Sequence, residues 1–186
     1  YDVSEKLRRY DRNLAEQISV SNGASKICFV FKNKPFVIKW STYGYHEAMD
    51  EVEIYNRAIT QDLAKFFPKT GFLIRVNGVD FVVQEKIDKA VSDCSRQDVQ
   101  KFQRIAKTAT DKIVFKIERE FGRAGNGYRR SLDHNWAKMA IVLYGKHACK
   151  ALCQFVVDNS INDLHGHNIG YKNGRPIILD FSGYHR

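Results

Sequence analysis

The chain has 186 residues, of which 44% are hydrophobic and 12% aromatic, a composition that is typical of a globular domain and not of a disordered segment. Its net charge of +9 at pH 7 suits a phosphate-bearing ligand, but the basic residues are spread along the chain, so we do not expect nucleic acid as a partner. No apolar run reaches the length of a membrane span, and the first residues do not resemble a signal peptide, so we expect neither.

The first half of the chain predicts strands with one helix inserted among them. The predicted elements are, in order, a helix over 3–18, a hairpin over 26–40, a helix over about 46–59, a short helical piece over 61–67 and a hairpin over 70–87. In the second hairpin, Asn77-Gly78 supplies the positive φ angles of a type I′ turn. This half is therefore expected to be rich in strands.

The second half predicts helices followed by one more hairpin. Ser95 and Asp98 form a capping-box-like start to a helix over about 95–121, and a second long helix is expected over 132–157. A third hairpin is expected over 169–179. The order contains no βαβ alternation and no P-loop motif, which argues against a Rossmann or P-loop fold.

The four cysteines indicate thiols and not a metal site. Cys149 and Cys153 lie four residues apart in an apolar helical pattern, so we expect them to share one buried helix face. A zinc site there would need two more ligands, and no Cys/His pair has the usual spacing. We interpret them as reduced core thiols of a cytosolic protein.

Polar residues gather in the last part of the chain. Asp163 and Asn168 are five residues apart, and Asp180 follows twelve residues after Asn168. A hairpin over 169–179 would bring Asn168 and Asp180 side by side, and carboxylate and amide oxygens are ligands that suit magnesium. Asp163 lies one short loop away, where it could accept a proton from a hydroxyl group. Capping and turn formation would explain any one of these residues, but explain all three less well.

The pattern D-L-H-x-x-N … I-L-D-F-S-G resembles the catalytic loop and metal-binding motif of the protein-kinase-like superfamily. The DLHGHN sequence is closer to small atypical kinases and to aminoglycoside and choline phosphotransferases than to typical protein kinases. In its short extent the chain resembles minimal bacterial and phage kinase-like proteins, including short effector kinases. The resemblance implies an α+β, two-lobed kinase-like fold in a single domain over 1–186, with a β-rich N-lobe over 1–88 and a truncated helical C-lobe over 89–186. Ile161 and Asn162 replace the His and Arg of typical protein kinases, so control by a phosphorylated activation loop is not expected.

The resemblance also requires a lysine on the third strand and a glutamate on the helix that follows. Lys39 in FVIKW occupies the strand position, and a lysine buried there would need a partner. Glu51 borders the apolar face of the helix and is the expected partner, with Glu53 as the second choice. The alternative is an exposed strand lysine and glutamates on a solvated helix face.

Further residues are expected to bind the nucleotide. Gly23 and Ser25 lie in the turn that the resemblance places over the phosphates, where the superfamily usually has two or three glycines. An ordinary polar turn explains these two residues equally well. Glu85 and Ile87 would present backbone groups to the adenine, with Gln84 just before them.

Together these features predict an ATP- and Mg²⁺-dependent phosphotransferase that acts on protein Ser/Thr or on itself. Asp163, Lys39 and Glu51 would be its catalytic residues, and Asn168 and Asp180 its metal ligands. The alternatives are a pseudokinase scaffold that binds a partner protein without transfer and a small-molecule kinase of the aminoglycoside or choline type. A protein acceptor or an activating partner protein is expected, in the cytoplasm or, for a secreted effector, in the cytosol of a host cell.

Overall fold

The structure is a computed structural model that describes residues 3–23, 25–42, 46–106, 111–123, 132–161 and 163–182. The chain forms two compact units and passes between them more than once. The first unit contains Tyr1–Glu53 and Lys69–Lys86, and the second contains Ile54–Pro68 and Ile87–Arg186. The segment of α3 after Glu53 therefore belongs to the second unit, although the helix itself is continuous.

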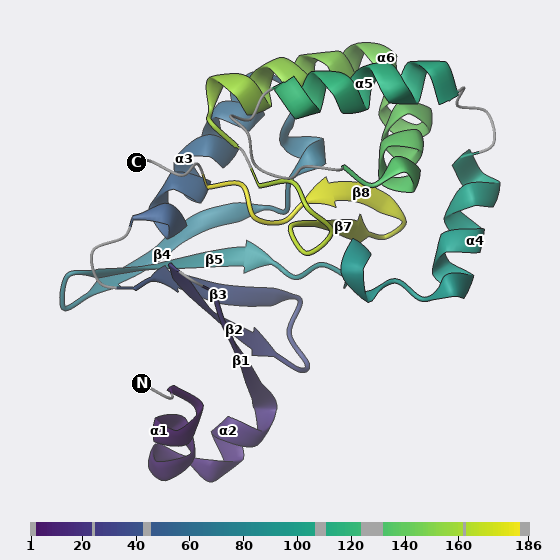
Figure 1. The fold of residues 1–186 in the computed structure, drawn as a ribbon. Helices are drawn as coiled ribbons and strands as arrows, with labels where there is room; N and C mark the ends of the chain where they lie inside the picture. Colours follow the sequence, from purple (N-terminus) through teal and green to yellow (C-terminus); the bar gives the residue numbers. More distant parts are fainter. Residues whose placement is uncertain are drawn as a thin grey trace. The chain divides into compact units, whose positions relative to one another are not determined.

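The first unit is built on a five-stranded antiparallel sheet with the strand order β1-β2-β3-β5-β4 (Figure 1). Its strands and short helices are α1 (Val3–Tyr10), α2 (Arg12–Gln17), β1 (Ile18–Asn22), β2 (Lys26–Phe31), β3 (Phe36–Ser41), β4 (Thr70–Val76) and β5 (Val79–Glu85). Aromatic and β-branched residues dominate β2 and β3 because they fit a pleated, half-buried surface. Asn77 and Gly78 have φ angles of 49° and 78°, as expected for a type I′ turn between β4 and β5.

Helix α3 (Glu47–Thr60) packs on one face of this sheet. Ala48 and Val52 on the helix form a buried cluster with Val82 of β5. Val82 is the partner of Lys39 in the β3–β5 register, and directly paired residues point to the same face of a sheet. The helix therefore covers the face that carries Lys39.

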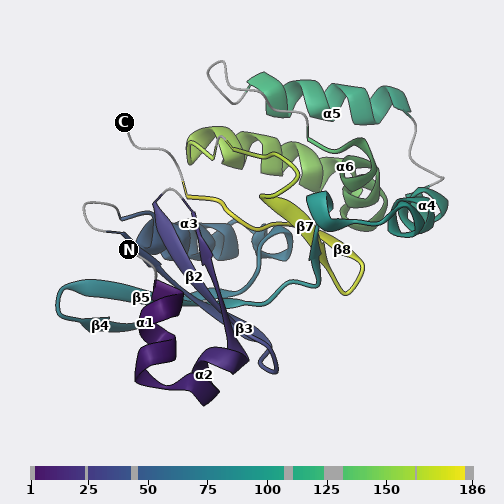
Figure 2. The same ribbon diagram turned by 60° about the horizontal axis from the view of Figure 1, so that its bottom comes forward.

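The second unit combines helices with a three-stranded antiparallel sheet of order β6-β7-β8. Its elements are the 3-10 helices η1 (Ala64–Phe66) and η2 (Val91–Asp93), the helices α4 (Arg96–Ile105), α5 (Asp111–Arg123) and α6 (His134–Asp158), and the strands β6 (Lys89–Ala90), β7 (Ile169–Lys172) and β8 (Arg175–Ile178). Helix α5 lies beside α6 in both views (Figures 1 and 2).

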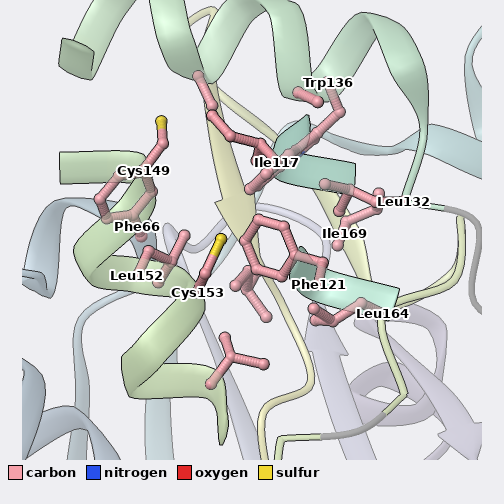
Figure 3. Close-up of a cluster of buried hydrophobic side chains, with 14 of the residues drawn as sticks. Phe66, Ile117, Phe121, Leu132, Trp136, Cys149, Leu152, Cys153, Leu164 and Ile169 are labelled. Carbon is pink, nitrogen blue, oxygen red and sulfur yellow. The ribbon is translucent and has the colours of Figure 1, made fainter. Parts of the chain in front are cut away.

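One hydrophobic core holds the helices and the hairpin of the second unit together. Figure 3 shows Phe121 of α5, Trp136 and Leu152 of α6, and Ile169 of β7 in this cluster, and all four are buried. Burial of side chains of this size stabilises the fold by roughly 1.5–3 kcal/mol each. The core therefore fixes the β7–β8 hairpin against the helices.

Cys149 and Cys153 belong to the same core, as the sequence pattern indicates (Figure 3). Burial raises the pKa of each thiol to about 12, so both groups stay protonated at neutral pH. All four cysteines are free thiols. The described residues contain no group of three or more His, Cys, Asp or Glu side chains that could hold a metal ion.

Trp136 adds a polar connection between α6 and the hairpin. Its indole N–H donates to the carbonyl oxygens of Gly170, at 3.0 Å, and Ile177, at 3.2 Å. One residue is on β7 and the other on β8, so a single buried side chain is bonded to both strands.

Helix α6 is the one helix in the described parts of the chain that is long and apolar enough, by length and composition, to cross a membrane. Gly145 interrupts it with φ 83° and ψ 157°, and the bend is visible in Figure 1. The segments on either side, 134–144 and 146–158, are each shorter than the roughly 17–25 residues that a transmembrane helix needs. Much of α6 packs into the core of the second unit instead.

The α+β class expected from the sequence is confirmed, but four elements differ from the sequence prediction. The helix expected over 3–18 is divided at Asp11 into α1 and α2. The helix expected over 95–121 is divided into α4 and α5, and α4 ends where the N–H of Ala106 donates to Phe102 O. Residues 107–110 lie outside the described part of the chain. Strands β1 and β6 were not predicted, because β1 is short and polar and β6 has only two residues.

We predict that Gly170→Ala destabilises the second unit. A Cβ atom at Gly170 would clash with the carbonyl oxygen of Lys89 and would lie 3.0 Å from Ala90 Cα, and backbone atoms cannot move aside cheaply. We expect a loss of about 1–3 kcal/mol in the free energy of unfolding, measured by urea denaturation. Gly166→Ala is the control, because its nearest neighbour would be at an ordinary 3.5 Å. Equal stability of the two variants would contradict the prediction.

Candidate functional site

A buried carboxylate lies at the centre of the first unit. Glu51 of α3 is fully buried, and its side chain accepts hydrogen bonds from three others. Lys26 Nζ is 2.7 Å from Glu51 Oε1, Lys39 Nζ is 3.1 Å from Oε2, and Gln84 Nε2 is 3.1 Å from Oε2. Because a charge without partners is costly inside a protein, these donors are what allow Glu51 to be buried in its ionised form.

The local sequence explains how these groups come together. Side chains alternate between the faces of a strand, so Lys26 and Cys28 of β2 share a face, and Cys28 pairs with Lys39 of β3. On α3, Ala48 and Glu51 are three residues apart, which places Glu51 beside the apolar stripe that packs on the sheet. The start of the helix is tied to the sheet because Ala48 N donates to Ser41 Oγ at 2.9 Å.

The ion pair that the resemblance requires is present, with Glu51 as the partner of Lys39. The other candidate, Glu53, is exposed on the same helix. The Lys26 contact was not predicted from the sequence, nor was the bond from Gln84 to Glu51. The available signal for Lys26 was its two-residue spacing from Cys28, which places it on the face that α3 covers.

Other polar groups that are wholly or partly buried surround the Glu51 carboxylate. Gln84 is held in place by a second hydrogen bond from Nε2 to Thr70 Oγ1, at 3.0 Å. The Cys28 thiol lies among the charged groups, and burial raises its pKa, while the Lys39 ammonium opposes that rise. The thiol is therefore neutral at pH 7, and the charges of the cluster come from the two lysines and Glu51.

Gly23 and Ser25 lie in the turn between β1 and β2, next to Lys26. The N–H of Gly23 donates to Lys26 O at 2.8 Å, and a Cβ atom at Gly23 would lie 3.3 Å from the same oxygen. The carbonyl of Ser25 accepts from both the N–H and the hydroxyl of Thr42, at 2.8 and 3.1 Å. The turn is therefore bonded to the chain that leaves β3, while Ala24 lies outside the described residues.

Glu85 and Ile87 flank the point at which the chain leaves the first unit. The N–H of Glu85 donates to Lys69 O at 2.8 Å, so the backbone group of Glu85 that could meet an adenine edge is its carbonyl. Between them, Lys86 Nζ donates to Phe31 O at 2.9 Å and fixes this segment to the end of β2.

In the second unit, the β7–β8 hairpin brings Asn168 beside Asp180. Ile169 pairs with Ile178, and the carbonyl of Asn168 accepts from Leu179 N at 2.8 Å and from Asp180 N at 3.4 Å. Ser182 Oγ donates to Asp180 Oδ1 at 3.2 Å. The backbone thus places the two side chains that were expected to share a metal ion at the same end of the hairpin.

Asn168 also connects this end of the hairpin to Asp163. Its Nδ2 donates to Asp163 O at 2.9 Å and to Asp163 Oδ2 at 3.1 Å. Since the amide nitrogen faces Asp163, the amide oxygen is the atom of Asn168 that can bind a cation. A carboxylate with one amide oxygen is a donor set that suits Mg²⁺, which keeps several waters and shares its shell with phosphates.

His165 braces the loop between Asp163 and Asn168. Its Nε2 lies 3.4 Å from Asp163 Oδ2 and 3.3 Å from Asn168 Nδ2, and its Nδ1 accepts from His167 N at 3.2 Å. The side chains of His165 and Asn168 thus both contact the same oxygen of Asp163, Oδ2.

No family model matches the chain, and no curated protein matches it. Solved structures that resemble it include the PK-1 kinase of Cydia pomonella granulovirus, with 14% identity and a TM-score of 0.40 over 96% of this chain and 56% of that one. Choline kinase LicA from Streptococcus pneumoniae has 18% identity and a TM-score of 0.37, over 97% and 67% of the two chains. The streptomycin–ATP–APH(2″)-IIa ternary complex has 10% identity and a TM-score of 0.35, over 93% and 69%.

The chain spans little more than half the length of the first of these kinases.

We predict that Glu51→Ala destabilises the protein much more than Glu53→Ala. Removal of Glu51 leaves the ammonium groups of Lys26 and Lys39 buried without the carboxylate that they share. We expect a loss of about 3–5 kcal/mol in the free energy of unfolding, measured by chemical denaturation.

Glu53→Ala is the matched control, since it removes an exposed carboxylate from the same helix and should change the stability by less than about 0.5 kcal/mol. Similar losses in the two variants would contradict the importance of the buried carboxylate.

Proposed function

We propose that this protein is an ATP- and Mg²⁺-dependent phosphotransferase, a kinase. The observation that carries the proposal is the ion pair between Lys39 Nζ and Glu51 Oε2, at 3.1 Å. The catalytic-loop motif near the end of the chain requires such a pair at these two positions, more than a hundred residues upstream. A match over this separation supports a phosphotransferase function for both sets of residues.

In this proposal, Lys39 binds phosphate oxygens of ATP and Glu51 orients it. A lysine is flexible and loses rotamer freedom on binding, so a buried carboxylate that fixes its ammonium lowers the cost of the contact. Glu51 acts as a positioning residue, because it touches the lysine and not the nucleotide. The Gly23 and Ser25 turn would cover the phosphates, and the Glu85 carbonyl and Ile87 N–H would meet the adenine edge.

Asp180 and Asn168 would hold the magnesium ion, which neutralises charge on the phosphates when it is bound. Asn168 has a second role that follows from its hydrogen bonds to Asp163. By donating to Asp163 Oδ2, it keeps the carboxylate oriented. Asp163 would then accept the hydrogen bond of the attacking hydroxyl group and align it. Positioning and charge neutralisation account for most of the catalysis of phosphoryl transfer.

The acceptor that we propose is a Ser or Thr hydroxyl of a protein, including this chain itself. The reaction needs ATP, and the core thiols Cys149 and Cys153 are reduced, so we place it in the cytoplasm. A scaffold that binds ATP without transfer is the second candidate, because the β1–β2 turn contains Gly23 as its single glycine. The DLHGHN sequence favours a small-molecule hydroxyl as the alternative acceptor.

We predict that Asp163→Ala abolishes phosphoryl transfer while ATP binding survives, since Asp163 would act on the acceptor and not on the nucleotide. Asp180→Ala should remove transfer together with the magnesium dependence of ATP binding. Both can be measured with labelled ATP, by autophosphorylation and by transfer to a mixed protein substrate and to choline and aminoglycosides. The binding of ATP is followed in parallel by calorimetry.

Asp158→Ala is the control, because it removes an exposed carboxylate at the end of α6 in the same unit. Transfer that is unchanged in Asp163→Ala would refute the mechanism. Binding of ATP by the wild-type protein without transfer to any acceptor would identify the scaffold instead.

A further inference from the structure

We propose that Lys26 is a second phosphate-binding lysine, which acts beside Lys39 on the phosphates of the nucleotide. This inference rests on the proposed function and concerns the same site. The motif resemblance asks for one lysine, on the third strand, and gives no role to a lysine on β2. The assignment of Lys26 therefore comes from the geometry around Glu51.

The two ammonium groups form a pair on one face of the sheet. Lys26 and Cys28 are alternate residues of β2, and Cys28 is paired with Lys39 of β3, so the lysines are diagonal neighbours within reach of each other's side chains. Each lysine binds mainly a different oxygen of Glu51, Lys26 at 2.7 Å from Oε1 and Lys39 at 3.1 Å from Oε2. One carboxylate thus positions both.

The charge of the cluster favours an anion. Lys26, Lys39 and Glu51 together carry one net positive charge, while Gln84 and the Cys28 thiol beside them are neutral. The lysine side chains are only 10% and 12% exposed, and electrostatic attraction is stronger where water is largely excluded. An ammonium group has three N–H donors, so each lysine can bind Glu51 and a phosphate oxygen at the same time.

The position of Lys26 in the chain connects it to the phosphate-covering turn. It is the first residue of β2, directly after the turn that contains Gly23 and Ser25, and its carbonyl accepts the N–H of Gly23 at 2.8 Å. The same residue therefore closes the turn with its backbone and reaches Glu51 with its side chain. A second lysine at this position would supply phosphate contacts that a turn with one glycine supplies poorly.

The rival role for Lys26 is that of a counter-ion that only keeps Glu51 in place. The two roles differ in their dependence on phosphate. A residue that touches phosphate contributes to the affinity for ATP and not to that for adenosine, whereas a residue that only maintains the fold affects both ligands alike.

The experiment measures the dissociation constants of Mg-ATP, Mg-ADP and adenosine by calorimetry, with the full chain and its Lys26→Met, Lys39→Met and doubly substituted variants. We expect Lys26→Met to weaken ATP binding about tenfold or more, as for loss of a charge-assisted hydrogen bond, and adenosine binding by less than about twofold. The double variant should bind ATP more weakly than either single variant. Lys34→Met, in the exposed turn after β2, is the control.

Lys26→Gln tests whether misfolding causes the loss of ATP affinity in Lys26→Met. Glutamine retains a hydrogen-bond donor for Glu51 but carries no charge, so this variant should fold and should lose ATP affinity to a similar extent. Unchanged ATP affinity in the folded Lys26 variants would overturn the inference, and so would equal losses for ATP and adenosine. In either case the wild type would still bind ATP and the proposed function would stand. Failure of the wild type to bind ATP would overturn the proposed function itself.

Discussion

The first unit depends on the burial of one ionised carboxylate. Glu51 is inaccessible to solvent, and the groups that compensate its charge come from three different strands, Lys26 on β2, Lys39 on β3 and Gln84 on β5. Buried ion pairs contribute little net stability, because desolvation offsets the attraction between the charges. They do penalise every arrangement in which a partner is displaced. The carboxylate therefore fixes the relative positions of three strands and of α3 more than it stabilises them.

The second unit positions its polar residues by a different means. The hydrophobic core and the indole of Trp136 hold the β7–β8 hairpin, and the hydrogen bonds at its open end hold Asn168, Asp180 and Asp163 together. Asn168 and Asp180 flank the paired strands of the hairpin, and the side chains of all three residues are only partly buried. Such a division, with a packed scaffold and polar side chains at its edge, is common in binding and catalytic sites.

Much of this arrangement could be predicted from the sequence because it follows from short-range rules. The Asn-Gly turns define two hairpins, and the second of them places Asn168 beside Asp180 from register alone. The apolar stripe on α3 separates Glu51 from Glu53. These inferences need only the period of a helix or strand and the geometry of a turn.

The parts that could not be predicted depend on long-range contacts. In the sequence, Lys26 is a polar residue at the start of an apolar strand, where an exposed side chain would be expected. Its ammonium group is buried only because α3 covers this face of the sheet. No Gly or Pro marks the end of α4, and a single glycine such as Gly145 is compatible with a continuous helix, so the break and the bend leave no clear local signal. Strand β6 exists because it pairs with β7, not because of its own two residues.

The proposed function requires that the cluster around Glu51 binds the phosphates of a nucleotide and that Asn168 and Asp180 at the open end of the hairpin bind a cation. The most direct measurement is a crystal structure of the full chain with Mg²⁺ and a non-hydrolysable ATP analogue. We expect a cation bound by the Asp180 carboxylate and the Asn168 amide oxygen, and the Lys39 ammonium on a phosphate oxygen of the analogue. A nucleotide bound without contact to Lys39, or a cation bound away from Asn168 and Asp180, would contradict it.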